Sequence, residues 1–124
     1  MKTCLVVDDS RVIRGVVREA LAEVGITAIE AEDGNEALAT FESQNPDAVI
    51  SDVQMPGVDG TELTRMLRER SKDRHVPIVV LSSLEDEASR KAGIAAGADA
   101  WLVKSIIDGP ALLRALKAAG LAIP

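Results

Sequence analysis

Five short apolar runs recur along the chain, and each is continuous rather than alternating between apolar and polar residues. They lie at residues 3–7, 27–31, 48–50, 78–81 and 100–103. Runs of this length predict strands that are buried on both faces, which is typical of a parallel sheet. The third run leads directly into a carboxylate, Asp52. A carboxylate beside a buried strand is costly unless something stabilises its charge.

The segments between these runs have the patterns of amphipathic helices. In the first segment, apolar residues recur at intervals typical of a helix, at Val12, Ile13, Val16, Val17, Ala20, Leu21 and Val24. Further helices are predicted to begin near Asp33, Asp59, Glu85 and Pro110, because acidic caps and an N-terminal proline favour a helix start. The exposed face of the helix after Asp59 is predicted to carry Arg65, Arg68 and Arg70.

Five strands that alternate with five helices predict a doubly wound α/β fold, with a five-stranded parallel sheet and helices on both faces. The flavodoxin-like order 2-1-3-4-5 suits five strands and places the topological switch point between the first and third strands. Residues 1–124 are predicted to form a single domain, since this length supports one core. Ligands of such sheets bind at the carboxyl ends of the strands beside the switch point.

Polar side chains follow four of the predicted strands, at the point where each strand ends. They are Asp8 and Asp9 after the first, Asp52 after the third, Ser82 after the fourth and Lys104 after the fifth. Clustered carboxylates repel one another unless a cation is present, and their hard oxygen atoms suit Mg²⁺. Lys104 and Ser82 are suited to bind the oxygens of a phosphoryl group. Asp52 is then predicted to be a nucleophile that forms an aspartyl phosphate.

Charge and composition narrow the possible functions. With 20 acidic and 14 basic residues, the chain has a net charge of -6, which disfavours direct binding to nucleic acid or to an anionic membrane. The only cysteine, Cys4, cannot form an internal disulfide, and the first residues have neither a signal-peptide pattern nor a membrane span. A cytoplasmic location without membrane insertion is therefore expected.

Two motifs make the chain similar to a known family. Residues 52–60 read Asp-Val-Gln-Met-Pro-Gly-Val-Asp-Gly, and residues 97–104 read Gly-Ala-Asp-Ala-Trp-Leu-Val-Lys. Together with the acidic pair and Ser82, they resemble the receiver domains of two-component response regulators, whose pattern includes D-x-x-M-P-x-x-D-G and G-A-D-x-[aromatic]-L-x-K. The resemblance extends over essentially the whole chain and keeps the motif positions in order.

The resemblance implies a signalling switch that is controlled by phosphorylation. Asp52 would accept a phosphoryl group from a sensor histidine kinase or a phosphotransfer protein. The cofactor would be Mg²⁺, with Mn²⁺ as a substitute, held by Asp8, Asp9, Asp52 and the backbone carbonyl of Gln54. Such a domain catalyses only its own phosphotransfer and dephosphorylation and is not otherwise an enzyme.

The resemblance also implies how the phosphoryl group is reported. Lys104 and Ser82 would bind it, and the aromatic side chain of Trp101 would change rotamer as Ser82 shifts. The fourth helix, fifth strand and fifth helix would then present an altered surface to a downstream target protein.

Two features depart from the family pattern. Receivers usually carry a cis proline after the lysine, whereas Ser105 follows Lys104 here, and a cis bond to a non-proline residue costs about 2.5 to 4 kcal/mol. A trans bond and a rearranged loop over residues 105–109 are therefore predicted. Gln54 and Leu84 occupy positions that tune dephosphorylation in the family, and an apolar Leu84 cannot position a water. Slow or externally assisted loss of the phosphate is predicted.

Two alternatives remain open from the sequence. The first is a binding module of receiver fold that does not use phosphate, for which Ser105 is the only favourable feature. The second is a Mg²⁺-dependent phosphatase, but that class carries a second acid two residues after the nucleophile, where this chain has Gln54. Because no helix-turn-helix or catalytic domain follows residues 121–124, output is expected through a surface, unless the chain is a piece of something longer. Two roles are compatible with output through a surface: control of a motor, as in chemotaxis, and transfer of phosphate as an intermediate of a phosphorelay.

Overall fold

The computed structural model describes residues 2–55, 57–83, 87–104 and 108–123, and the strands in these ranges form one five-stranded parallel sheet. The strands are β1 Thr3–Val7, β2 Thr27–Ala31, β3 Ala48–Asp52, β4 Ile78–Ser82 and β5 Ala100–Val103. Their order is β2-β1-β3-β4-β5, which confirms the predicted flavodoxin-like arrangement. Val7 lies opposite Ser51, so β1 and β3 end side by side.

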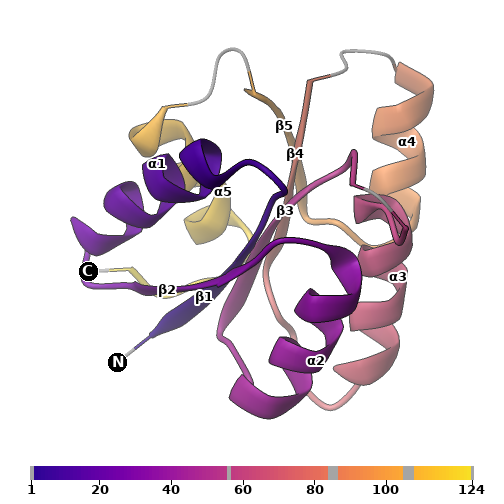
Figure 1. Ribbon diagram of the computed structural model, residues 1–124, viewed down its shortest axis with the longest axis horizontal. Helices are drawn as coiled ribbons and strands as arrows, with labels where there is room; N and C mark the ends of the chain where they lie inside the picture. Colours follow the sequence, from indigo (N-terminus) through magenta and orange to yellow (C-terminus); the bar gives the residue numbers. More distant parts are fainter. Residues whose placement is uncertain (1, 56, 84–86, 105–107, 124) are drawn as a thin grey trace.

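Within the described residues, five helices cover the two faces of the sheet. They are α1 Arg11–Ala22, α2 Gly34–Gln44, α3 Gly60–Arg70, α4 Glu87–Ala95 and α5 Gly109–Ala118. Figure 1 shows α1 and α5 on one face and α2, α3 and α4 on the other. Short polar side chains cap α1, α2, α3 and α5 by accepting a main-chain hydrogen bond three residues on, from Ser10, Asp33, Asp59 and Asp108. None of the described helices is long and apolar enough to span a membrane.

The side chains of β1 show why the strands have continuous apolar sequences. Leu5 and Val7 belong to the core cluster on the face covered by α2 and α3. Cys4 and Val6 belong to the cluster on the face covered by α1 and α5. Successive side chains of a strand point to opposite faces, and here both faces are buried. Apolar residues are therefore needed at every position.

Arg68 of α3 and Arg14 of α1 are less exposed than the spacing of apolar residues along their helices indicates. The prediction that Arg68 lies on the exposed face of α3 is wrong: its guanidinium donates to the main-chain oxygens of Gly97 and Val76 and pairs with Asp99 at 2.8 Å. In α1, Arg14 is buried, although two residues of the apolar pattern on that helix are exposed, at Val12 and Val16. Buried Arg14 and half-buried Arg68 both have partners outside their own helices, and the local spacing of apolar residues does not reveal these partners.

Candidate functional site

Two carboxylates meet where β1 and β3 end. Because Val7 lies opposite Ser51, Asp8 and Asp52 come next on these neighbouring strands. Asp8 and Asp52 are only 1% and 4% exposed, whereas Asp9 faces solvent. Carboxylate oxygens of the three aspartates lie within 4.8 Å of one another. The structure therefore brings the acids together at the switch point of the sheet, as the sequence pattern predicts.

The ammonium group of Lys104 reaches this cluster from the end of β5. Its Nζ atom lies 2.9 Å from Asp8 Oδ2 and 3.0 Å from Asp52 Oδ2. Burial works to lower the pKa of Lys104, but hydrogen bonds to the two carboxylates raise that pKa above its usual value. Burial raises the pKa of Asp52; the hydrogen bond from Lys104 opposes this only in part, and repulsion from Asp8 adds to it. One shared ammonium group thus leaves Asp52 partly uncompensated.

The cluster has the charge and the oxygen ligands for a divalent cation. Asp8 Oδ2 is buried, and among the described residues its one polar contact is the ammonium group of Lys104. One ammonium group shared by two buried carboxylates leaves a net negative charge that a further cation would compensate. Asp9 is exposed, which leaves room for the water molecules that Mg²⁺ usually retains. The residues therefore fit the predicted metal site.

Main-chain contacts hold the buried acids in place. Asp8 Oδ1 accepts a hydrogen bond from the N–H of Ser10 at 2.8 Å, and Asp52 Oδ1 accepts one from the N–H of Gln54 at 3.3 Å. The first residue of α3, Gly60, packs directly on the end of β3, since a Cβ atom there would lie 2.3 Å from the carbonyl oxygen of Asp52. Glycine is required here because any side chain would displace the strand end that carries Asp52.

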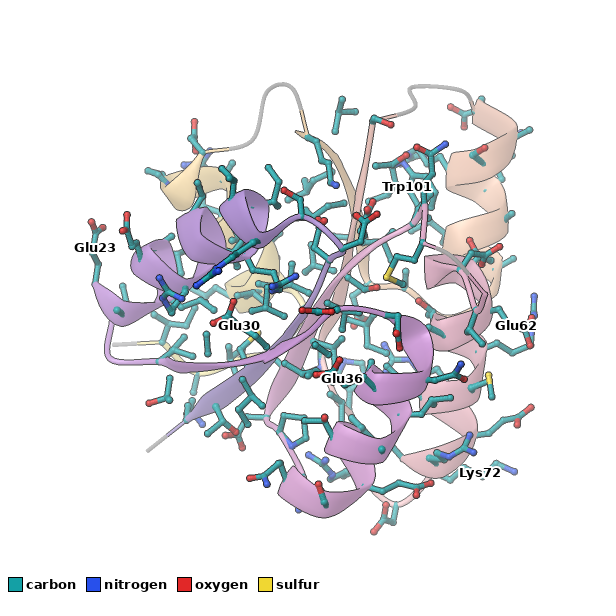
Figure 2. All side chains as sticks on the ribbon, viewed as in Figure 1. Glu23, Glu30, Glu36, Glu62, Lys72 and Trp101 are labelled. Atoms are coloured by element: carbon teal, nitrogen blue, oxygen red, sulfur yellow. The ribbon has the colours of Figure 1, made fainter. Side chains whose placement is uncertain are left out.

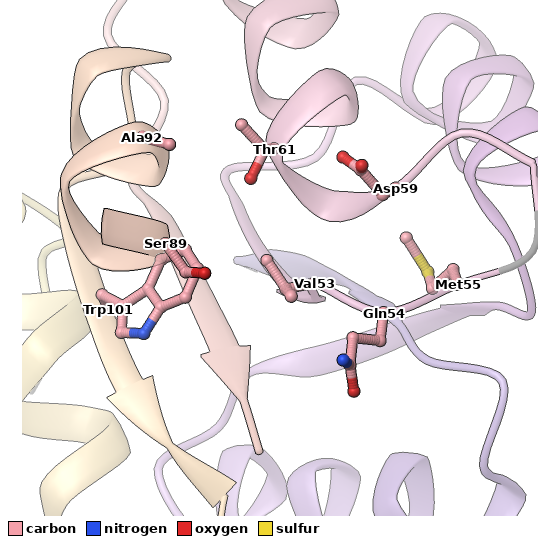
Figure 3. A pocket seen from close by; sticks show the side chains of 8 residues that line it. All are labelled: Val53, Gln54, Met55, Asp59, Thr61, Ser89, Ala92 and Trp101. Atoms are coloured by element: carbon pink, nitrogen blue, oxygen red, sulfur yellow. The ribbon is translucent and has the colours of Figure 1, made fainter. Parts of the chain in front are cut away.

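The predicted switch residues lie on the neighbouring strands β4 and β5. Ser82 is buried at the end of β4, and Trp101 is half-buried in β5. The indole of Trp101 packs on Gly93 of α4, where an added Cβ atom would lie 2.3 Å from ring atom Cζ3. A cavity of about 600 Å³ opens beside the indole between α4 and the loop after β3 (Figure 3), lined by Val53, Gln54, Met55, Asp59, Thr61, Ser89, Ala92 and Trp101. The ring therefore borders an open cavity.

The residues proposed to tune dephosphorylation are only partly described. The Gln54 side chain is exposed, and its Oε1 atom accepts a hydrogen bond from the Ser83 hydroxyl at 3.0 Å. Leu84 and Ser105 lie outside the described residues, as does the bond between Lys104 and Ser105. The backbone carbonyl of Gln54 as a metal ligand, the trans bond and the rearranged loop over residues 105–109 stay predictions.

Comparison with known proteins decides the family. The family model for the response regulator receiver domain matches residues 4–117, which is most of the chain. The chain belongs to this family. It is therefore a receiver domain of the response regulators of two-component signalling, and the resemblance predicted from its motifs is confirmed.

Named relatives of this receiver are larger proteins. The response regulator MprA of Mycolicibacterium vanbaalenii is 45% identical over 100 residues, which are 81% of this chain and 42% of that protein. A gliding motility regulatory protein of Myxococcus xanthus is 36% identical over 112 residues, which are 90% of this chain and 14% of that protein. The receiver thus spans less than half the length of these relatives.

Solved receiver structures share its fold. The chemotaxis protein CheY4 of Vibrio cholerae matches with a TM-score of 0.86 at 37% identity, over 94% of this chain and 97% of that chain. The receiver domain of response regulator 1452 from Francisella matches with a TM-score of 0.84 at 29% identity, over 96% of this chain and 97% of that chain. Both scores show that the chain shares its overall fold with these structures.

Arg14 is one residue of the receiver's site that the sequence pattern did not identify. Its Nη1 atom donates a hydrogen bond to the main-chain oxygen of Asp8 at 2.6 Å. A signal was present, because Arg14 precedes the buried Val17 and Leu21 by three and seven residues and so shares their face of the helix. A charged residue at an inward helix position indicates a specific partner.

Proposed function

We propose that this receiver is a phosphorylation-controlled switch in which Asp52 accepts a phosphoryl group from a phosphohistidine. The observation that carries the proposal is the contact of Lys104 with two buried carboxylates, Asp8 and Asp52, where their strands end. A carboxylate beside a cation site and an ammonium group has what is needed to attack phosphorus and to stabilise charge on its oxygens. The donor is a sensor histidine kinase or a phosphotransfer protein.

In the proposed step, a carboxylate oxygen of Asp52 attacks the phosphorus of the donor. A P–O bond forms, the P–N bond to the donor imidazole breaks, and its electron pair returns to the imidazole nitrogen. The products are an acyl phosphate on Asp52 and a free histidine. Lys104, which pairs with Asp52 before the reaction, supplies positive charge to the phosphoryl oxygens. The Ser82 hydroxyl donates a hydrogen bond to one of these oxygens.

Three carboxylates of this chain would hold the cation, namely those of Asp8, Asp9 and Asp52, with the backbone carbonyl of Gln54 as a further ligand. Bound Mg²⁺ neutralises and orients phosphoryl oxygens, and Mn²⁺ suits the same ligands. In this proposal the domain catalyses only its own phosphotransfer and dephosphorylation. The phosphate is lost slowly, because Leu84 cannot position a water.

The proposed output surface comprises α4, β5 and α5 and is read by a downstream target protein. The cavity beside Trp101 and the half-burial of all of β5 support this, since they allow rearrangement there. The net charge of -6 argues against direct binding to nucleic acid. The proposed compartment is the cytoplasm, whose reducing environment suits the buried, free thiol of Cys4.

Mass spectrometry after incubation with Mg²⁺ and acetyl phosphate tests the phosphoacceptor. The wild-type protein is expected to gain one phosphoryl group, and Asp52→Asn none. Asp59→Asn is the matched control, because it removes a helix-capping carboxylate outside the acid cluster. This variant is expected to be phosphorylated like the wild type.

Fluorescence of Trp101, the single tryptophan, gives a second readout. Adding beryllofluoride with Mg²⁺ is expected to change its emission in the wild type but not in Asp52→Asn. A folded protein that shows neither mass gain nor fluorescence response contradicts the proposal and favours a binding module that does not use phosphate. Repeated turnover of a phosphate ester favours the phosphatase instead.

A further inference from the structure

Arg14 is a buried charge on α1. Its side chain is only 8% exposed, and it lies on the same helix face as the buried residues Val17 and Leu21. Burying a guanidinium group costs free energy unless its charge and its N–H donors are satisfied. The partners of Arg14 therefore indicate what this residue does.

The guanidinium group of Arg14 connects two segments of the chain. Its Nη1 donates to the main-chain oxygen of Asp8 at 2.6 Å, and its Nε donates to Glu30 Oε1 at 3.1 Å. The Nη2 atom also lies 3.9 Å from Glu32 Oε1. Glu30, labelled on β2 in Figure 2, accepts a second hydrogen bond at its other oxygen from Arg18 at 3.0 Å. Arg14 is thus held by β2 and the residue after it while it binds the loop that carries Asp8.

The polar atoms of Asp8 are almost all engaged. Its N–H donates to the carbonyl oxygen of Ala31 at 3.2 Å, its carbonyl oxygen accepts from Arg14, and its Oδ1 atom accepts from Ser10. Within the described ranges, Oδ2 is contacted only by the ammonium group of Lys104. The contact from Arg14 therefore satisfies the main chain of Asp8 and leaves a carboxylate oxygen for a cation.

We propose that Arg14 is a positioning residue for the cation site, because it fixes the main chain of Asp8 so that the Asp8 carboxylate converges with Asp52. The inference rests on the proposed function, which requires the acid cluster to bind a divalent cation. The donor set of Arg14 suits this role, since a planar guanidinium can bind a carbonyl and a carboxylate at the same time.

Two effects of Arg14 on a bound cation oppose each other. Its positive charge repels the cation, whereas its hydrogen bond holds a ligand in place. The ion pairs with Glu30 and Glu32 compensate the charge, so the positioning effect dominates. Groups that orient metal ligands typically change metal affinity about 10- to 100-fold. Loss of Arg14 is therefore expected to weaken cation binding.

Binding of Mn²⁺ alone, followed by the EPR signal of the free ion, tests this without phosphotransfer. Arg14→Met removes all the donors, and Arg14→Lys keeps the charge but cannot bind Asp8 and Glu30 through one planar group. Arg18→Met is the matched control, because Arg18 pairs with the same glutamate from a position that is 53% exposed. The dissociation constant is expected to rise about tenfold in Arg14→Met and about threefold in Arg14→Lys. It should stay within about twofold in Arg18→Met.

Thermal melts first establish which variants are folded at the assay temperature, and Arg14→Lys decides the question if Arg14→Met unfolds. Wild-type affinity in the folded Arg14 variants, or equal weakening in Arg18→Met, overturns the inference and leaves the proposed function intact. Tighter binding in Arg14→Met also overturns it, because charge repulsion would then dominate. Absence of Mn²⁺ binding in the wild type, or undiminished binding in Asp8→Asn, contradicts the proposed cation site and the inference with it.

Discussion

The two sides of the candidate site differ in how firmly they are packed. On the side of the acidic pair, β1, β3 and β4 are buried almost throughout, and Arg14 joins the loop after β1 to β2. On the side of Trp101, every residue of β5 is only half-buried. Gly93 is the one buried residue among the described positions of α4.

This contrast indicates different physical roles for the two sides. Ligands for a cation or a phosphoryl group bind best when they are already in place, which dense packing around the acids provides. A helix that buries little apolar surface shifts at a low free-energy cost. The acid side is therefore expected to bind, and the α4–β5 side to change its arrangement when binding occurs.

The largest expected difference between the two sides is in core packing. Leu21 of α1 is fully buried, whereas Ile94 of α4 is 41% exposed. Leu21→Ala is expected to lower the free energy of unfolding by about 3 kcal/mol, since it leaves a cavity in the core. Ile94→Ala is expected to lower it by less than about 1 kcal/mol. Urea denaturation followed by circular dichroism measures both, and equal losses would remove the contrast.

The same substitution at two glycines sharpens the comparison. An added Cβ atom at Gly60 meets the backbone of Asp52 and Val53, which cannot yield, so Gly60→Ala is expected to cost about 3 kcal/mol. An added Cβ atom at Gly93 meets the ring of Trp101, which can rotate, and alanine favours the helix by about 1 kcal/mol. Gly93→Ala is therefore expected to change stability by less than about 1 kcal/mol but to shift the Trp101 emission. Unchanged emission, or a large loss of stability, would contradict the prediction that α4 and β5 rearrange at a low free-energy cost.

A hydrogen bond from Ser83 to Gln54 links the loops that follow β4 and β3. Ser83→Ala frees the Gln54 amide to interact with the phosphoryl group or a water molecule. The lost hydrogen bond is worth about 0.6 kcal/mol. If this free energy becomes available to lower the barrier to hydrolysis, the lifetime of the phosphate on Asp52 is expected to shorten about threefold. Decay of the phosphorylated mass with time measures this. Ser43→Ala, on the exposed surface of α2, is the control, and equal lifetimes in all three proteins would contradict the prediction.

The smallest expected effect concerns the pH dependence of the Arg14 side. Burial works to raise the pKa of Glu30, but hydrogen bonds from Arg18 and Arg14 lower it overall in the folded protein. Ionised Glu30 therefore stabilises the folded protein at pH values above the pKa that Glu30 has in the unfolded chain. This stabilisation is lost as the pH falls through the lower pKa of Glu30 in the folded protein.

Glu30→Gln is accordingly expected to reduce the free energy of unfolding at neutral pH and to leave it unchanged at strongly acidic pH, where the wild-type side chain is protonated. Urea denaturation at both pH values measures the difference. Glu23→Gln, at the exposed end of α1, is the control. A difference between the wild type and Glu30→Gln that persists unchanged into strong acid would contradict an effect of the carboxylate charge.

Much of the fold and the position of the acids could be predicted because both depend on local patterns. Strands buried on both faces must be apolar at every position, so their places along the chain are visible in the sequence. A residue directly after such a strand lies at the edge of the sheet, and parallel strands end at the same edge. Asp8, Asp52 and Lys104 can therefore be assigned to one site from the sequence.

Contacts between distant segments could not be predicted in the same way. Arg68 satisfies its guanidinium group with main-chain oxygens of Gly97 and Val76 and with the carboxylate of Asp99. A main-chain oxygen is present at every residue, so the sequence gives no sign of which one an arginine will reach. Only tertiary packing selects it, and the expectation of an exposed Arg68 was wrong for this reason.

The sequence by itself thus determined the element order, the strand ends and the acids and lysine that follow them, because these depend on side-chain chemistry and on regular backbone geometry. The tertiary structure alone decided that Arg14 binds the main chain of Asp8 and that Trp101 packs on Gly93. Both contacts join residues of different elements at a specific distance and orientation. Such geometry arises only when the helices are packed on the sheet.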